Sequence, residues 1–125
     1  MRSKNRVFRI MLALMILTLW VQAYDGEIGN AQQQTVVLVI IPKESSLNIH
    51  LGFQPEKLTL VLGVNNTVTW RNDDTEWHTA HSNLPEFDSG LIQPGQSFTH
   101  FFNRAGIYPY HCDPHPWMTG IIIVK

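Results

Sequence analysis

The chain is 125 residues long, with 44% hydrophobic and 15% charged residues and a formal net charge of −1. This length and composition suit one domain with a hydrophobic core, and they exclude a largely disordered chain. The chain has a single cysteine, so a disulfide bond within the chain is excluded as well.

The first 23 residues have the pattern of a secretory signal peptide. Four basic residues precede an apolar run from Ile10 to Ala23, which is shorter than the roughly 20 residues that span a bilayer. Residues 21–23 form a small-residue cleavage site, and residues 29–31 form a second candidate. We therefore predict an exported protein, periplasmic or otherwise extracytoplasmic, with a signal peptide over residues 1–23. The alternative is an uncleaved N-terminal anchor that attaches the protein to the membrane.

Removal of this segment changes the charge of the chain. Without residues 1–23 the formal charge is −5, because four of the nine Lys and Arg residues are lost. The remaining basic residues are widely scattered, whereas phosphate binding needs a clustered basic face. We therefore expect no nucleic-acid partner. Export also means that the free thiol of Cys112 would lie in an oxidising compartment and would need protection.

After a polar linker over residues 24–34, the pattern over residues 35–125 is one of short strands. Six segments are rich in β-branched and aromatic residues: 35–41, 57–62, 67–71, 97–102, 107–111 and 120–124. Turn residues lie between them, and no segment keeps a helical period long enough for a substantial helix. The sequence therefore predicts an all-β domain, an antiparallel Greek-key β-sandwich.

An acidic turn follows the third of these segments. It contains Asp73, Asp74 and Glu76, just before His78. Charged residues in a turn usually face solvent, so we interpret the three as a solvated turn. Electrostatic steering of a partner protein is the alternative.

The last loop of the chain carries three side chains that bind metals. Cys112, His115 and Met118 are spaced three residues apart in the stretch YHCDPHPWM. Thiolate, imidazole and thioether together suit copper that cycles between Cu(I) and Cu(II), with two His and one Cys around the ion and a weak axial Met. Structural zinc does not use a thioether. A catalytic Cys112 with His115 as its base would need a geometry that so short a loop rarely provides.

The copper hypothesis requires a second histidine from a distant segment. His111 is next to Cys112 on a predicted strand, so its side chain should point to the opposite face. His78 and His81 both follow the acidic turn, and this reasoning alone leaves the choice between them open.

These segments resemble the cupredoxins, the small blue copper proteins that include plastocyanin, pseudoazurin and amicyanin. The resemblance covers residues 47–125 and is carried by KLTLVLGVNNTVTWRNDD before His78 and by QPGQSFTHFFNRAGIYPYHCDPHPWMTGIIIVK at the end. The ligand loop looks most like that of amicyanin. The resemblance implies a cupredoxin-like sandwich in which one type 1 copper ion is bound by His78, Cys112, His115 and Met118.

The same resemblance implies a carrier of single electrons and not an enzyme. Redox partner proteins would dock near His115, Pro116 and Trp117, and we expect a monomer. One alternative is a copper carrier or storage protein, although such proteins usually have Met-rich or Cys-pair sites. An oxidase or nitrite reductase would need further copper ions, usually bound by additional histidine clusters.

The chain departs from the usual family pattern beside two ligands. Many members have an Asn after the first ligand histidine, and its side chain ties that loop to the residue after the cysteine. Here these two positions are Thr79 and Asp113. A hydroxyl donor facing a carboxylate acceptor would restore the tie, so we expect a hydrogen bond between them.

Overall fold

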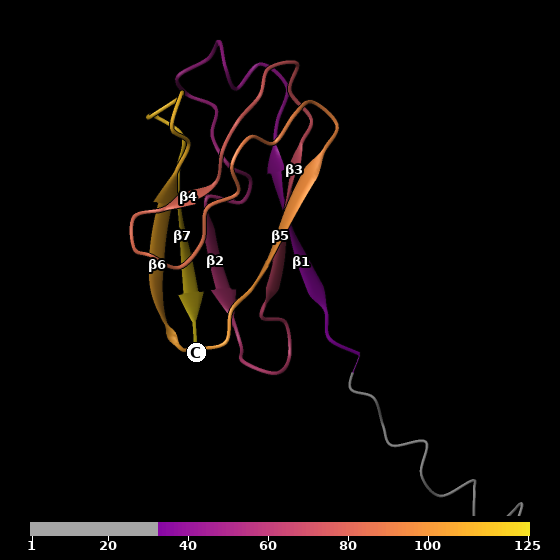
Figure 1. The fold of residues 1–125 in the computed structure, drawn as a ribbon, viewed down its shortest axis with the longest axis vertical. Helices are drawn as coiled ribbons and strands as arrows, with labels where there is room; N and C mark the ends of the chain where they lie inside the picture. Colours follow the sequence, from indigo (N-terminus) through magenta and orange to yellow (C-terminus); the bar gives the residue numbers. More distant parts are fainter. Residues whose placement is uncertain (1–32) are drawn as a thin grey trace, which may run out of the picture. The chain divides into compact units, whose positions relative to one another are not determined.

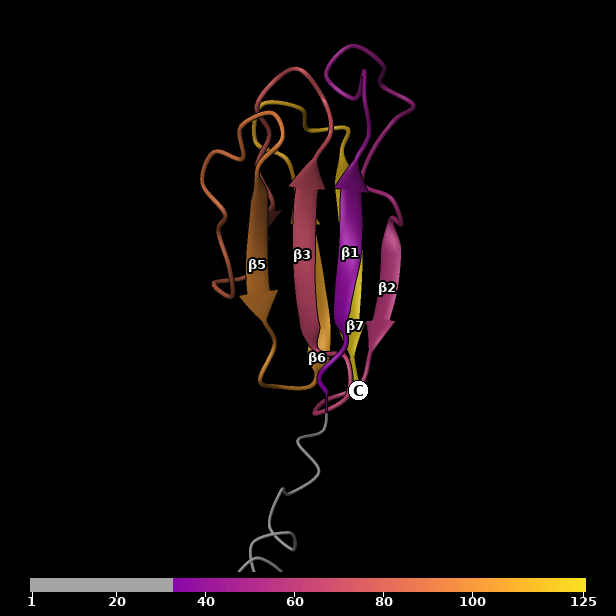
Figure 2. The same ribbon diagram turned by 90° about the vertical axis from the view of Figure 1, so that its right-hand side faces the viewer.

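The computed structural model describes residues 33–125, which form two β-sheets packed face to face (Figures 1 and 2). The predicted signal peptide over residues 1–23 and most of the linker over residues 24–34 lie outside the described residues. Within residues 33–125, no helix is long and apolar enough to cross a membrane. The predicted β-sandwich is confirmed.

Seven strands build the two sheets. In chain order they are β1 (Val36–Ile41), β2 (Lys57–Leu60), β3 (Thr67–Asn72), β4 (His81–Ser82), β5 (Ser97–Phe101), β6 (Gly106–His111) and β7 (Thr119–Val124). The six strands expected from the sequence are all present, with their ends shifted by at most two residues. Strand β4 has no counterpart among the predictions, because two residues are too few to show an alternating pattern.

One sheet has the order β1-β3-β5, and the other has the order β2-β7-β6-β4. Figure 2 shows β1, β3 and β5 side by side in one layer. Both sheets are mixed, because β1 pairs with β3 in parallel and β2 pairs with β7 in parallel. The expectation of purely antiparallel pairing is corrected here. Every connection except that from β6 to β7 passes from one sheet to the other. The chain therefore leaves the first sheet after β1, adds β2 to the second sheet, and returns to the first sheet as β3 in the same direction as β1.

The core lies between the sheets and follows the alternation of side chains along the strands. In β3, Val68 and Trp70 are fully buried, whereas Arg71 is exposed. The Trp70 ring packs against Phe87 and Tyr110, with ring centroids 5.1 and 5.6 Å apart. This aromatic packing gives the loops at the ends of the sandwich a rigid base.

Two connecting loops meet at one end of the sandwich (Figure 1). They are the loop that joins β3 to β4 and the loop that joins β6 to β7. The second loop closes on itself, because Met118 N–H donates to His115 O at 2.8 Å and Cys112 N–H donates to Met118 O at 3.0 Å. The backbone thus keeps these three residues within one compact turn.

Candidate metal centre

Three donor atoms from the two loops converge at this end of the sandwich. The Cys112 Sγ atom is 3.6 Å from the Nδ1 atom of His78 and 3.6 Å from that of His115. The two Nδ1 atoms are 3.1 Å apart. His78 and Cys112 are fully buried, and His115 is half-buried. Residues 34 positions apart in the chain therefore bring nitrogen and sulfur donors to one point.

Met118, the fourth predicted ligand, is fully buried in the same turn. Its backbone is hydrogen bonded to both Cys112 and His115. A thioether has little demand for hydrogen bonds, so this buried position carries no polar penalty. The turn thus holds all three sulfur and imidazole side chains that the sequence places in this loop.

The structure separates the two histidines between which the sequence left a choice. His78 reaches Cys112, whereas His81 points to the surface, where its Nδ1 atom is 3.0 Å from Asp113 Oδ1. The His81 side chain is 41% exposed. His111 also faces away from Cys112, as expected for neighbours along a strand.

The buried carboxylate of Asp74 orients the ring of His78. The interpretation of Asp74 as part of a solvated turn was therefore wrong. Asp74 is only 3% exposed, and its Oδ2 atom accepts a hydrogen bond from His78 Nε2 at 2.9 Å. Asp74 also accepts hydrogen bonds from the backbone N–H groups of Glu44, Ser46 and Thr75. Because Nε2 donates to the carboxylate, the lone pair of the ring lies on Nδ1, which faces Cys112 Sγ and His115 Nδ1. Such carboxylate partners fix the ring of a metal-binding histidine and raise its basicity.

No sequence signal distinguishes Asp74 from its neighbours. Asp73 is partly exposed and pairs with Arg71 at 2.7 Å, and Glu76 is exposed, as expected of a solvated turn. The carboxylate of Asp74 points inward to its backbone donors, and its own N–H group donates to the Oδ1 atom of buried Asn72 at 2.9 Å. An irregular loop has no periodicity from which this burial follows.

The surroundings shift the pKa of three groups at the site. Burial by itself would raise the pKa of Asp74, but hydrogen bonds from His78, Ser46 and Thr75 lower it far below its usual range. Burial raises the pKa of the Cys112 thiol. Burial lowers the pKa of His115, and a protonated His78 would lower it further. A metal ion that binds the sulfur must therefore displace a thiol proton.

The expected tie between the two loops is confirmed. Thr79 Oγ1 donates to Asp113 Oδ2 at 2.9 Å and accepts from Asp113 N–H at 2.8 Å. The backbone N–H of Thr79 donates to Cys112 Sγ at 3.3 Å. The tie therefore holds the two loops together, and it also directs a donor at the sulfur, which favours the thiolate form.

Comparison with known proteins finds relatives of the same kind. Residues 9–124 match the cupredoxin-like domain family. Amicyanin from Paracoccus denitrificans is 36% identical over 67 residues, which cover 50% of this chain and 51% of the relative. The chain thus spans about half the length of that relative. Plastocyanin from Scenedesmus fuscus is 34% identical over 88 residues, which cover 60% of this chain and 88% of the relative.

Solved structures share the sandwich. A purple cupredoxin from Nitrosopumilus maritimus superposes with a TM-score of 0.64 and 31% identity, over 71% of this chain and 99% of that chain. A mutant of amicyanin in its Cu(I) form superposes with a TM-score of 0.60 and 26% identity, over 74% of this chain and 84% of that chain. The likeness therefore extends well beyond the loop that carries Cys112.

Proposed function

The chain belongs to the cupredoxin-like family, and on this basis we propose that it is a small blue copper protein that carries single electrons between redox partners. One type 1 copper ion would be bound by His78, Cys112, His115 and Met118. The observation that carries the proposal is the convergence of two imidazole nitrogens and one sulfur, each within 3.6 Å of the others.

The chemistry of the donor set fits copper. Imidazole, thiolate and thioether suit both Cu(I) and Cu(II), and the thioether argues against structural zinc. When bound, copper supplies a one-electron redox couple. The chain positions the donors in advance, because Asp74 orients the His78 ring and the Thr79 N–H group faces the Cys112 sulfur. Ligands held in this way need little rearrangement when an electron arrives or leaves.

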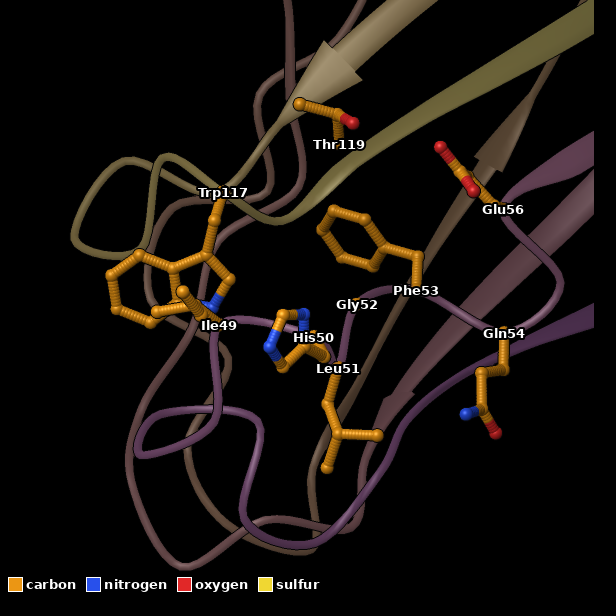
Figure 3. Close-up of a pocket in the computed structure, with 9 residues that line it drawn as sticks. All are labelled: Ile49, His50, Leu51, Gly52, Phe53, Gln54, Glu56, Trp117 and Thr119. Atoms are coloured by element: carbon orange, nitrogen blue, oxygen red, sulfur yellow. The ribbon is translucent and has the colours of Figure 1, made fainter.

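His115 offers the route by which electrons would enter and leave. It is half-buried, and the neighbouring Pro116 and Trp117 are exposed. The Trp117 ring packs edge-on against His115, with ring centroids 5.2 Å apart. A groove of about 330 Å³ lies beside Trp117 and is also lined by Ile49, which is 65% exposed (Figure 3). The exposed side chains of Pro116, Trp117 and Ile49 give a small contact surface beside His115, which suits weak and fast encounters with redox proteins.

Export belongs to the same proposal. Residues 1–23 would act as a cleaved signal peptide, residues 24–34 as a linker and residues 35–125 as the cupredoxin domain. The support is the row of basic residues before an apolar run. N-terminal sequencing of the exported protein tests this. A first residue at Tyr24 supports cleavage, whereas an intact Met1 indicates an N-terminal membrane anchor.

The visible spectrum after addition of Cu(II) tests the copper site. We expect intense absorption near 600 nm, roughly the region of a copper–thiolate bond, which bleaches on reduction and returns on oxidation. The Cys112→Ala variant should lack the band, and the matched variant His100→Gln on β5 should keep it. A colourless wild-type protein would overturn the proposal. Transfer of copper to a chelator within seconds would favour the alternative, a copper carrier or storage protein.

A further inference from the structure

A second cluster of metal-binding side chains lies on the outer face of the sheet, beside the proposed copper site. The donor atoms of His81, His111 and Asp113 all lie within 4.8 Å of one another. The His81 Nδ1 atom is 3.0 Å and the His111 Nε2 atom 3.3 Å from the same oxygen, Asp113 Oδ1. We propose that this cluster binds a divalent cation of the Zn²⁺ class, and that the bound cation raises the reduction potential of the copper site.

Strand pairing builds the cluster. His81 on β4 lies directly opposite His111 on β6, and residues opposed in this way present their side chains on one face. The two rings stack with centroids 5.4 Å apart. Asp113 follows His111 by two positions and returns to the same face, while Cys112 between them points inward. The three donors therefore converge without any movement of a loop.

Hydrogen bonds leave a lone pair of His111 directed at the cluster. His111 Nδ1 donates to Asn83 Oδ1 at 2.6 Å, so the neutral ring carries its lone pair on Nε2. This lone pair faces a carboxylate oxygen of Asp113, so two lone pairs repel each other. A cation bound between the nitrogen and the oxygen would replace this repulsion by two attractive contacts. A polar partner on the outer nitrogen is also what metal-binding histidines usually have. The other oxygen of Asp113 is held by Thr79, so the carboxylate is oriented too.

The spacing and the exposure suit zinc. Nitrogen and oxygen ligands lie at about 2.0–2.2 Å from Zn²⁺, so tetrahedral donors are separated by about 3.3 Å. The observed distances to Asp113 Oδ1 are 3.0 and 3.3 Å. The three side chains are 34–47% exposed, so water can complete the coordination. The cluster contains no sulfur, which separates its metal preference from that of the neighbouring thiolate site.

Asp113 connects this cluster to the proposed copper site. Its carboxylate binds Thr79 Oγ1, and the N–H group of Thr79 donates to Cys112 Sγ. A cation on Asp113 offsets a negative charge near the sulfur and disfavours the more positive Cu(II) state. By linkage, the reduced protein should bind zinc more tightly than the oxidised protein. A tenfold preference corresponds to a rise of about 59 mV in a one-electron potential. This second half of the proposal rests on the proposed copper function, whereas zinc binding itself does not.

Calorimetric titration with ZnCl₂ tests the site in protein loaded with one equivalent of copper. We expect one zinc ion per chain, and roughly tenfold or greater loss of affinity in His81→Gln and in His111→Gln. The control is His50→Gln, which removes an exposed histidine outside the cluster and should bind zinc as the wild type does. The zinc site would be overturned if the wild type bound no zinc. It would also be overturned if His81→Gln and His111→Gln bound zinc with the same affinity as His50→Gln.

Voltammetry of the copper-loaded protein with and without zinc tests the coupling. The potential should rise with zinc in the wild type and in His50→Gln, and it should stay constant in His81→Gln. A constant wild-type potential despite zinc binding would refute the coupling. A protein that binds zinc through His81 but never turns blue with copper would refute the copper function and the coupling, and would leave the zinc site established.

Discussion

Replacing Asp74 by Asn tests whether one buried carboxylate holds the metal centre together. The substitution keeps the shape of the side chain and removes its charge. In the wild type, Oδ1 accepts from the N–H groups of Glu44 and Thr75, and Oδ2 accepts from Ser46 N–H and the His78 ring. An amide side chain can accept at only one of these two positions. In either orientation, two donors would face an NH₂ group.

The expected loss follows from this count of donors. Each buried donor without a partner costs about 1–3 kcal/mol, which gives about 2–6 kcal/mol for two. Three of the four hydrogen bonds are only partly buried, so water can replace part of the loss. We therefore expect the free energy of unfolding to fall by about 2–3 kcal/mol. A domain with about 5–15 kcal/mol of stability should still fold after such a loss.

Urea unfolding of the copper-free protein, followed by tryptophan fluorescence, measures this difference. The hydrogen bonds keep the pKa of Asp74 below its unfolded value, so the stabilisation is complete above about pH 4 and is lost as the pH falls through the folded pKa. The gap between wild type and Asp74→Asn should therefore narrow in strong acid. The matched control is Asp73→Asn, whose carboxylate pairs with Arg71 at the surface and should matter little.

Two results would contradict this reasoning. The first is an Asp74→Asn variant that is as stable at pH 7 as Asp73→Asn. The second is a loss of stability that stays the same from neutral pH to strong acid, since the effect would then not depend on the carboxylate charge.

Three further predictions concern the tie between the loops, the core and the half-buried His115. Thr79→Val should shift the reduction potential and destabilise the protein by about 1–3 kcal/mol, because both hydrogen bonds to Asp113 are lost. An unchanged spectrum and potential in this variant would show that the tie between the loops does not influence the copper site. Gly120→Ala should cost about 1–3 kcal/mol in chemical denaturation, because the added methyl group would overlap the buried ring of Tyr110. The reduction potential should rise from neutral to mildly acid pH, because protons compete with Cu(I) for His115; voltammetry that finds no pH dependence would count against it.

Local patterns in the sequence were enough to predict six of the seven strands and the loop that carries Cys112, His115 and Met118. Successive side chains of an extended chain point to opposite faces, so the alternation of buried and exposed residues in β3 follows from the local sequence. Cys112, His115 and Met118 lie within seven residues, so their proximity follows from chain length alone. The inward side chain of Cys112 and the outward side chain of His111 follow from the same alternation.

Contacts between distant segments were decided by the tertiary structure. The spacing of residues does not separate His78 from His81, whereas the packing of the two loops brings His78 to the sulfur of Cys112 and His81 to the surface. The parallel pairs β1–β3 and β2–β7 likewise depend on how the connections cross between sheets.

The burial of the Asp74 carboxylate and the formation of the outer cluster around Asp113 were likewise decided by contacts between distant segments. Asp74 is held by backbone donors up to 30 residues away, and the cluster forms only because β4 pairs with β6. Side-chain period and residue chemistry act over a few neighbouring residues, whereas the partner of a buried charge depends on the path of the whole chain. Sequence alone therefore determined which chemical groups this protein has, and folding determined which of them meet.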